Sequence, residues 1–516
     1  MKKILIFTFF LVLTLSLTSY SLNLPQHWDA LFTIIPSAIY SLENNFSPFS
    51  PFNLGHPPFL AVSLSFLYYL FGYSLLVTHL YIIFLAFWSV FFAYLISEHL
   101  TKNKYIGITT ALLFLFSPIF VGQSGIVTLA TPFTTFSLMS IYFFLRNKYI
   151  LFLIMSFLLS YTVESGVVLL MGLLFLPILK EFNNLNLKRV TLYSLPFMFY
   201  LSWLALSKFH WGWFFNPYQV GEVLSLNPFR NMLHLFFGLR VLFLDDFRWV
   251  LTSIIFLSTI YTKKNSKILY PFIFSVLLYL LLSNLNLFFP QLNDSLSNLM
   301  IELKNFSILF SILFFIFLNY RKRFYKYYIK SNLSFIIPII IFVIAFHAFI
   351  VVHPRYLLPL YPLFYIFSGI ALFKIFKNYT FIPLIVILAL FISNWTGESD
   401  STGVILEYNK EYVDMLYTHQ QATKFIEENY PNANVMVSGF PQHLELLNPY
   451  GGYVKNPIKV EQFDREKLKK KEGIDLFYYS PQSTLNRDFP HQAEEFNLIL
   501  LKKFERNNKT AYIFKV

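Results

Sequence analysis

The chain is predicted to be a polytopic α-helical membrane protein that ends in a separate α/β domain. Apolar residues make up 56% and aromatic residues 20% of its 516 residues. Runs of about 18 or more apolar residues, long enough to cross a bilayer as helices, recur between residues 4 and 395. Residues 396–516 instead carry 15 Lys or Arg and 17 Asp or Glu, so the net charge of +13 belongs to the apolar part. The chain has no Cys, which excludes disulfides, thiolate nucleophiles and zinc–thiolate sites.

Basic residues gather in short loops between the apolar runs, as is typical of loops that stay in the cytoplasm. We interpret this charge as topogenic rather than as a nucleic-acid surface. Placing these loops inside predicts about 13 spans in residues 1–395, with the N-terminus inside and the C-terminus outside. The predicted spans are approximately 4–22, 75–98, 105–122, 128–145, 149–163, 166–180, 190–207, 247–262, 268–285, 303–319, 333–352, 357–374 and 379–395.

The segment 57–72 decides this topology. It is apolar but short, and it opens with Pro57-Pro58. Counting it as a span would place most of the clustered basic residues outside, against the positive-inside rule. We therefore expect a helix that lies in the outer interface or packs on the bundle, within an outer loop of residues 23–74. A competing interpretation makes the first apolar run, after Lys2-Lys3, a cleaved signal peptide, which leaves one span fewer and the same orientation.

This topology places the charges that chemistry needs on the outer face. Such a face suits a lipid-linked anionic substrate with a leaving phosphate, because guanidinium groups bind phosphate through bidentate, charge-assisted hydrogen bonds. The predicted outer acidic residues are Asp29, Glu43, Glu164, Glu222, Asp245, Asp246, Asp294 and Glu302, and the outer basic residues are Lys208, Arg230, Arg240, Arg248, Lys304 and Arg355.

Five motifs, taken in order, resemble the GT-C class of integral membrane glycosyltransferases. They are similar, more narrowly, to the protein O-mannosyltransferase and aminoarabinose transferase group of bacterial enzymes, and the resemblance covers the whole chain. The motifs are Trp28-Asp29-Ala30, Gly55-His56-Pro57-Pro58-Phe59-Leu60, Phe116-Ser117-Pro118, Trp211-Gly212-Trp213-Phe214-Phe215-Asn216-Pro217 and Pro354-Arg355-Tyr356-Leu357-Leu358-Pro359-Leu360-Tyr361-Pro362.

The resemblance implies transfer of a sugar from a polyprenyl-phosphate donor to a lipid, glycan or protein acceptor, with inversion at the anomeric carbon. It also implies the cytoplasmic membrane of a bacterium or archaeon, with the active site on the outer face. The reaction needs a carboxylate for the acceptor, cations for the departing phosphate and a cavity without water. Asp29 is the predicted catalytic residue. The lipid phosphate is assigned to Arg355, Arg248, Arg240, His56 and Lys208, and the sugar or acceptor side to Glu164, Trp28, Trp211 and Tyr356.

Each of these assignments has a structural competitor. Asp29 could cap a short helix over residues 30–40 or be a solvated loop carboxylate, and His56 could be a loop histidine. Arg355 could snorkel to lipid headgroups, and the other basic residues could form an interfacial belt with Trp. Glu164 could form a buried structural hydrogen bond.

The chain departs from the family pattern at two acidic positions. Relatives tend to have an acid where Ala30 and Ala130 stand here, and Val163-Glu164 keeps only the acid of a Lys-Glu pair. These changes leave the acceptor type open. They also leave few ligands for a divalent ion, so no metal cofactor is expected, although the sequence does not exclude one. The polyprenyl-phosphate sugar is then the only co-substrate expected.

Residues 396–516 are predicted to form an extracytoplasmic α/β domain with a lid or acceptor-guiding role. A helix is expected over 407–430, and the basic run 467–471 is interpreted as a solvated helix face. Strands are expected over 433–437, 458–463, 475–479, 496–504 and 510–516.

Two other functions fit part of the pattern. An O-antigen-type ligase or polymerase, or a flippase, shares the apolar spans and outer charges. A non-catalytic transporter would need internal repeats and broken helices, and we find no convincing repeat. The outer C-terminal domain and the spacing from Asp29 to His56 favour the transferase.

Overall fold

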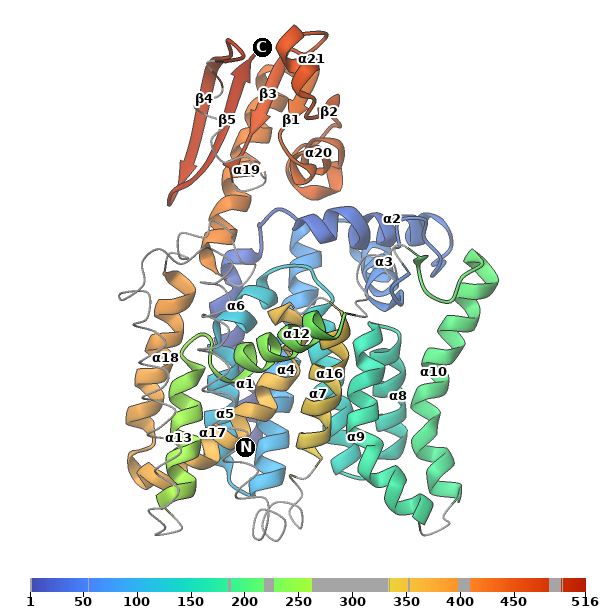
Figure 1. Cartoon of the computed structure of the whole chain (residues 1–516), viewed down its shortest axis with the longest axis vertical. Coiled ribbons are helices and arrows are strands. Elements are labelled where there is room, and N and C mark those ends of the chain that lie inside the picture. The colour runs from blue at the N-terminus through green and yellow to red at the C-terminus, as the bar shows by residue number, and fades with distance from the viewer. Residues whose placement is uncertain are drawn as a thin grey trace. The chain divides into compact units, whose positions relative to one another are not determined.

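The computed structural model describes residues 2–53, 55–183, 187–217, 227–261, 333, 335–350, 353–397, 409–481, 493 and 495–516. Helices make up most of the described part of the first 397 residues, and a five-stranded sheet follows in the C-terminal part (Figure 1). The main helices of the apolar part are α1 (Lys2–Thr18), α4 (Leu75–Thr101), α5 (Lys104–Leu115), α6 (Pro118–Gly125), α7 (Ala130–Leu145), α8 (Tyr149–Ser160), α9 (Glu164–Asn183), α10 (Leu187–Trp211), α12 (Pro228–Phe243), α13 (Arg248–Tyr261), α16 (Ile336–Phe349), α17 (Leu360–Phe376) and α18 (Phe381–Thr396).

Each predicted span that falls within the described residues overlaps a described helix or pair of helices. The predicted spans 268–285 and 303–319 lie outside the described residues. Among the described residues, four helical segments are long and apolar enough to cross a membrane, or five if α5 and α6 form one span. The chain is therefore a polytopic α-helical membrane protein. The number of about 13 spans and their orientation stay predictions.

The predicted span 105–122 is not one continuous helix. It consists of α5 and α6, with Ser117 between them in an extended backbone conformation and Pro118 at the first position of α6. Proline has no N–H to donate, so it is accepted at a helix start and removes a hydrogen bond inside a helix. The sequence interpretation was wrong in this detail.

Three short helices occupy the predicted outer loop, residues 23–74. The last of them, α3, matches the helix expected over 57–72. Its 13 residues reach about 20 Å at about 1.5 Å per residue, less than the roughly 30 Å of a bilayer core. Leu60 and Leu64 of α3 are buried against Ile35 and Ala38 of α2. The helix is thus packed against its neighbour, and its place at the membrane interface stays a prediction. The three are the π-helix η2 (Ala30–Ile34), α2 (Ile35–Glu43) and α3 (Phe59–Phe71).

The chain divides into two compact units. The first joins the outer loop to the C-terminal part, and the second holds most of the predicted phosphate-binding residues. The first unit comprises Met1–Trp88, Ser117–Pro132 and Ile392–Val516, and the second comprises Ser89–Phe116 and Phe133–Phe391.

The C-terminal part is a mixed sheet with strand order β2-β1-β3-β5-β4 (Figure 1). β1 pairs in parallel with β2 and β3, whereas β5 pairs antiparallel with β3 and β4. All five predicted strands and the predicted helix are present, with ends that differ by a few residues. The elements are α19 (Lys410–Asn429), β1 (Val435–Val437), α20 (Phe440–Leu447), β2 (Val460–Gln462), α21 (Arg465–Lys470), β3 (Leu476–Tyr479), β4 (Ile499–Arg506) and β5 (Lys509–Lys515).

The two faces of this sheet bury alternate strand residues, as the pleat requires. Tyr478 and Ile513 pack with the core that contains Ile426 of α19, whereas Phe477 and Phe514 pack on the other face. On that second face lies Leu468 of α21, while Lys469 and Lys470 are exposed. The basic run is thus a helix with a solvated face, as expected. The domain boundary at residue 396 and the outer location stay predictions.

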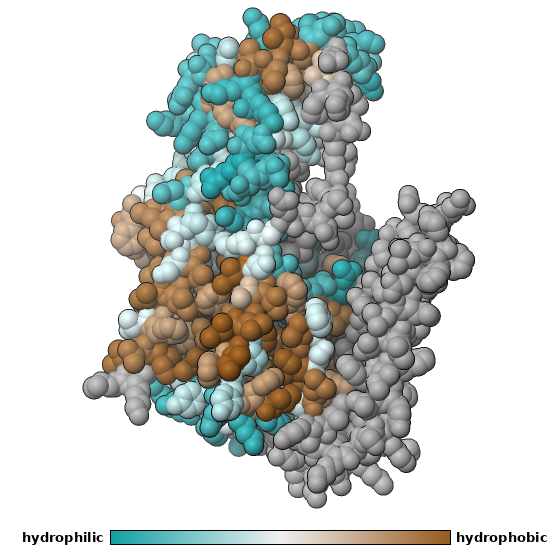
Figure 2. Space-filling model, turned by 90° about the vertical axis from the view of Figure 1, so that its left-hand side faces the viewer, coloured by the Kyte–Doolittle hydropathy of each residue, from teal (hydrophilic) through white to brown (hydrophobic). Residues whose placement is uncertain are grey.

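The surface of the helical part is largely apolar. Figure 2 shows hydrophobic residues gathered over helices on the face in view, whereas the described surface of the sheet-bearing part is mostly hydrophilic. On α18, four large apolar side chains are more than half exposed, which a soluble protein rarely tolerates in one patch. Lipid is the solvent that suits such a surface. The four are Phe381, Ile382, Ile385 and Val386.

Candidate active site

Asp29, the predicted catalytic carboxylate, directly precedes η2 in the first unit. Asp29 is exposed, Trp28 is partly buried and His27 is 1% exposed. The backbone N–H of Asp29 donates to Nδ1 of His27 at 3.2 Å, and the backbone carbonyl of Asp29 accepts from the hydroxyl of Thr33 at 2.9 Å. Within the described segment, the Asp29 side chain forms no capping hydrogen bond to η2. The capping interpretation therefore does not account for this residue.

His56 lies in the same unit as Asp29, in a turn organised by Asn53. The side chain of Asn53 accepts from the N–H of Gly55 at 3.1 Å and donates to the carbonyl oxygen of His56 at 2.7 Å. Gly55 has a φ of 95°, which glycine adopts without a steric cost. The His56 residue remains partly exposed. Its contact with a phosphate stays a prediction.

Arg355 lies in the second unit, in the 3-10 helix η5 (Pro354–Leu357) between α16 and α17. The residue is partly buried, and its guanidinium carbon is 5.5 Å from the ring centre of Tyr356. That ring lies 5.4 Å from the ring of His353 and 5.5 Å from the ring of His347 in α16. Arg355 therefore lies beside a cluster of aromatic rings formed by Tyr356, His353 and His347.

Glu164 is the first residue of α9, and the next residue, Ser165, contacts the aromatic cluster beside Arg355. The hydroxyl of Ser165 lies 3.4 Å from Nε2 of His347, and both residues are buried. Nδ1 of His347 lies 3.0 Å from the carbonyl oxygen of Val343, so we assign the ring hydrogen to Nδ1 and let Nε2 accept from Ser165. The second unit thus brings the start of α9 close to the Arg355 turn. Sequence reasoning missed His347, although a histidine inside the apolar run 333–352 was a visible signal.

The guanidinium group of Arg248 is buried and hydrogen-bonded to residues of the second unit. Its side chain is 1% exposed. Nε and Nη2 donate to the carbonyl oxygen of Val241 at 3.1 and 2.6 Å, and Nη1 donates to Asp246 at 3.0 Å. The guanidinium also lies over the ring of Tyr361, 4.6 Å from its centre. A lipid phosphate would have to displace these partners, so the described contacts are those of a structural residue.

Arg240 lies near the end of α12, a helix that sequence reasoning did not expect. The side chain of Asn227 caps the start of α12, and the helix packs on α16 and η5. Nδ1 of His234 lies 2.8 Å from the carbonyl oxygen of Ile350. Arg240 pairs with Asp245 at 3.0 Å and is 34% exposed. The fold therefore places α12 beside the Arg355 turn.

Lys208 and Trp211 lie in the last turn of α10. Nζ of Lys208 donates to the carbonyl oxygen of Gly212 at 2.7 Å and lies 5.6 Å from the ring centre of Phe214. Trp211 stacks on Trp213 with ring centres 5.0 Å apart. Such a group is common in an interfacial belt, and its contacts with substrate stay predictions.

The arrangement of helices and sheet resembles that of solved structures. The chain is similar to the crystal structure of ArnT from Cupriavidus metallidurans bound to undecaprenyl phosphate, with a TM-score of 0.55 and 12% sequence identity over 98% of this chain and 97% of that chain. The chain has the fold of ArnT. The apo structure of the same ArnT gives a TM-score of 0.52 with the same identity and coverage. No protein-family model and no curated protein matches the sequence.

The likeness to ArnT confirms, at the level of the fold, the resemblance to the aminoarabinose transferase group that the five motifs indicated. At 12% identity it supports the architecture and does not assign a role to any residue. The role of each predicted site residue therefore stays a prediction, and the contacts of Arg248 favour a structural role over phosphate binding.

Among the described residues, no group of three or more His, Asp or Glu side chains is placed to hold a metal ion. Independence from metals stays a prediction that activity measurements can test.

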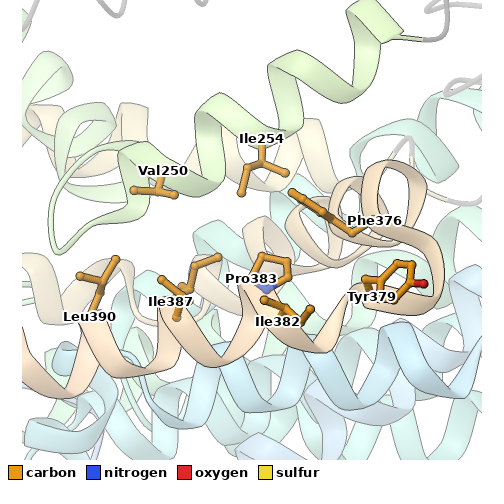
Figure 3. Close-up of a pocket in the computed structure, with 9 residues that line it drawn as sticks. Val250, Ile254, Phe376, Tyr379, Ile382, Pro383, Ile387 and Leu390 are labelled. Atoms are coloured by element: carbon orange, nitrogen blue, oxygen red, sulfur yellow. The ribbon is translucent and has the colours of Figure 1, made fainter.

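A cavity of about 440 Å³ lies in the second unit among α13, α17 and α18. Figure 3 shows Val250 and Ile254 of α13 facing residues of α18 across this space. None of the described lining residues is charged, so the cavity suits hydrocarbon rather than a sugar phosphate. None of the predicted site residues is among the described residues that line it. The lining residues are Val250, Ile254, Phe376, Tyr379, Ile382, Pro383, Val386, Ile387 and Leu390.

Proposed function

We propose that the chain is an inverting glycosyltransferase that moves a sugar from a polyprenyl-phosphate donor to a lipid, glycan or protein acceptor. The observation that supports this most is the likeness to ArnT, which covers 98% of the chain and includes a structure bound to undecaprenyl phosphate. We place the reaction at the outer face of a bacterial or archaeal cytoplasmic membrane, because the predicted topology puts the carboxylates and guanidinium groups there.

In the proposed reaction, Asp29 acts as the general base. An acceptor hydroxyl attacks the anomeric carbon, and its proton passes to the carboxylate of Asp29. The new carbon–oxygen bond forms as the bond from the anomeric carbon to the phosphate oxygen breaks, so the configuration inverts. General base catalysis of this kind contributes about 10²–10⁴-fold to a rate. The exposed position of Asp29 on a hydrogen-bonded backbone supports this role.

The leaving group is the lipid phosphate, and Arg355 is proposed to bind it. A guanidinium offers paired N–H donors that match two phosphate oxygens and stabilise the negative charge that develops. Arg240 lies on the helix that packs against η5 and is partly exposed, so we propose it as a second cation. His56 and Lys208 are kept as further phosphate contacts, and Glu164, Trp28, Trp211 and Tyr356 as sugar or acceptor contacts.

This mechanism uses protein cations instead of a metal ion. Ala30 and Ala130 remove two carboxylates that could help to hold a divalent cation. We therefore expect full activity in the presence of a chelator.

The direct test uses the full-length protein in lipid nanodiscs with a panel of polyprenyl-phosphate sugars. Release of polyprenyl phosphate is measured for the wild type, Asp29→Asn and Asp29→Glu. We expect turnover of at least one donor and a loss of at least about 100-fold in Asp29→Asn. Absence of turnover with every donor, or an unchanged rate in Asp29→Asn, would show that the proposal is wrong.

A further inference from the structure

The segment that carries Asp29 is hydrogen-bonded to the C-terminal part of the chain, within the first compact unit. The hydroxyl of Tyr453 donates to the carbonyl oxygen of Gln26 at 3.0 Å, and the N–H of Gln26 donates to the carbonyl oxygen of Gly451 at 2.8 Å. The side chain of Asn448 donates to the carbonyl oxygen of Leu31 at 3.4 Å. These bonds reach the backbone on both sides of Asp29.

An aromatic contact reaches the two residues just before Asp29. Tyr412, in the first turn of α19, is 1% exposed. Its ring centre lies 5.4 Å from that of His27 and 6.3 Å from that of Trp28. Nδ1 of His27 in turn accepts the backbone N–H of Asp29. Tyr412 therefore packs against the side chain that holds the Asp29 backbone.

The C-terminal side of this contact is itself fixed. The side chain of Gln420 donates to the carbonyl oxygen of Gly452 at 2.7 Å, and the hydroxyl of Thr423 donates to the carbonyl oxygen of Tyr453 at 3.2 Å. Helix α19 therefore holds the turn that is hydrogen-bonded to Gln26. A Cβ atom on Gly451 would lie 2.7 Å from the side chain of Leu31, which shows how closely the two segments approach. Sites supported by such rigid neighbours keep their geometry better than free loops.

We infer that the C-terminal part positions Asp29 for catalysis and that Tyr412 is the central positioning residue. This inference rests on the proposed role of Asp29 and extends it to the residues that support the carboxylate. It gives the C-terminal part a defined task in the reaction, in place of the general lid or acceptor-guiding role that the sequence suggested. Tyr412 is not expected to touch the substrate. Its loss is therefore expected to act on the rate of the chemical step rather than on binding of the donor.

The test compares kcat and the donor KM for three variants of the full-length protein. In Tyr412→Leu we expect kcat to fall about tenfold or more, because a displacement of about 1 Å can cost about 100-fold, while the donor KM stays the same. Tyr412→Phe keeps the ring and should keep the rate. Phe514→Leu, a buried change on the other face of the sheet, is the matched control for a general loss of stability and should leave kcat unchanged.

A double-mutant cycle separates this inference from the proposed function. In the Asp29→Asn background, Tyr412→Leu should cause no further loss. A wild-type rate in Asp29→Asn would reject the function of Asp29. A large loss in Asp29→Asn with equal effects of Tyr412→Leu and Phe514→Leu on kcat would reject only the positioning role. If Tyr412→Leu does not fold, Tyr453→Phe removes one hydroxyl; the inference predicts a lower kcat, and an unchanged kcat rejects it.

Discussion

Arg248 and Asp246 form an ion pair at 3.0 Å although only 1% of the arginine side chain and 12% of the aspartate side chain are exposed. The other two nitrogens of Arg248 donate to Val241, so the guanidinium ties the end of α12 to the start of α13. Removing water from both charges is costly, and the pair is tolerated because every described nitrogen has a partner. If one partner is removed, the other stays buried without compensation.

The first prediction is that Arg248→Ala mainly lowers the stability of the folded protein and has no direct effect on donor binding. Loss of one partner of a buried pair costs about 3–5 kcal/mol. Thermal unfolding of the purified protein should show a clear fall in Tm. Arg240→Ala is the matched control, because its pair with Asp245 is partly exposed and such pairs contribute about 1 kcal/mol or less. If Arg248→Ala keeps its Tm and raises the donor KM, Arg248 is a phosphate ligand after all.

The second prediction concerns Arg355, for which the opposite pattern is expected. Arg355→Ala should lower kcat/KM for the donor by about 10–150-fold, since hydrogen bonds to charged groups are each worth about 1.5–3 kcal/mol. Arg355→Lys should recover only part of the loss, because an ammonium group does not bind two phosphate oxygens in one plane. The Tm should change little in both variants. A normal kcat/KM in Arg355→Ala would exclude this residue from the phosphate site.

Much of the secondary structure was predictable because its signals are local. The strands β1 and β3 are short apolar runs bounded by polar residues, such as Val435–Val437 between Asn434 and Ser438. The apolar helices followed from the length of their runs in the same way. One local signal, Pro118, was present and was given too little weight, so the break between α5 and α6 was missed.

The site was less predictable because its contacts are not local. Tyr453 and Gln26 are 427 positions apart in the sequence and are joined by a hydrogen bond. No repeating pattern of apolar and polar residues could predict such a contact. The burial of Arg248 depends on Val241 and on the packing of α17, so its charge looked available in the sequence. The helix α12 mixes polar and apolar residues after Pro228 and gave no span signal. Residue types suggested the chemistry, and tertiary packing decides which of them can perform it.

The third prediction tests the topology, and the absence of Cys makes the test clean. Single cysteines are introduced at exposed positions and labelled in intact cells with a membrane-impermeant maleimide. Glu43 is the last residue of α2 and Phe71 is the last residue of α3, so the two positions lie on either side of α3. Both Glu43→Cys and Phe71→Cys should be labelled, because α3 is too short to cross. Asn429→Cys should also be labelled, whereas Asn147→Cys and Asn378→Cys should react only after permeabilisation. Labelling of Glu43→Cys without Phe71→Cys would make α3 a span and reverse all later loops.

The fourth prediction concerns a buried polar group in the C-terminal part. Nδ1 of His419 lies 2.8 Å from Glu445, and Nε2 lies 2.8 Å from the hydroxyl of Ser480, which gives the outline of a Ser-His-Glu triad. All three residues are at most 2% exposed, so the serine cannot meet a substrate and the group is structural. Glu445→Ala should cost at least about 1–3 kcal/mol, because it leaves the buried Nδ1 of His419 without its hydrogen-bond partner. Faster hydrogen exchange in β1 and β3 would report this.

The control for this change is Glu495→Ala, which breaks the pair of Glu495 with Arg465. That pair has the longer spacing of 3.0 Å, and its side chains are 48% and 62% exposed, so its loss should cost less than about 1 kcal/mol. Similar exchange rates in the two variants would mean that the buried group does not stabilise the sheet.

The fifth prediction concerns Gly172 of α9, which lies against the backbone of α16. A Cβ atom there would lie 2.6 Å from the Cα of Ile339, and this neighbour is backbone, which cannot turn aside. Small residues allow such close helix contacts in membranes. Gly172→Ala should therefore push α16 away from α9 and disturb the contact between Ser165 and His347 next to the Arg355 turn. We expect a lower Tm and a lower kcat/KM for the donor.

Met171→Ala, at a neighbouring side chain that is 43% exposed, is the control and should behave as wild type. Equal behaviour of the two variants would show that the spacing of α9 and α16 does not set the geometry of the site.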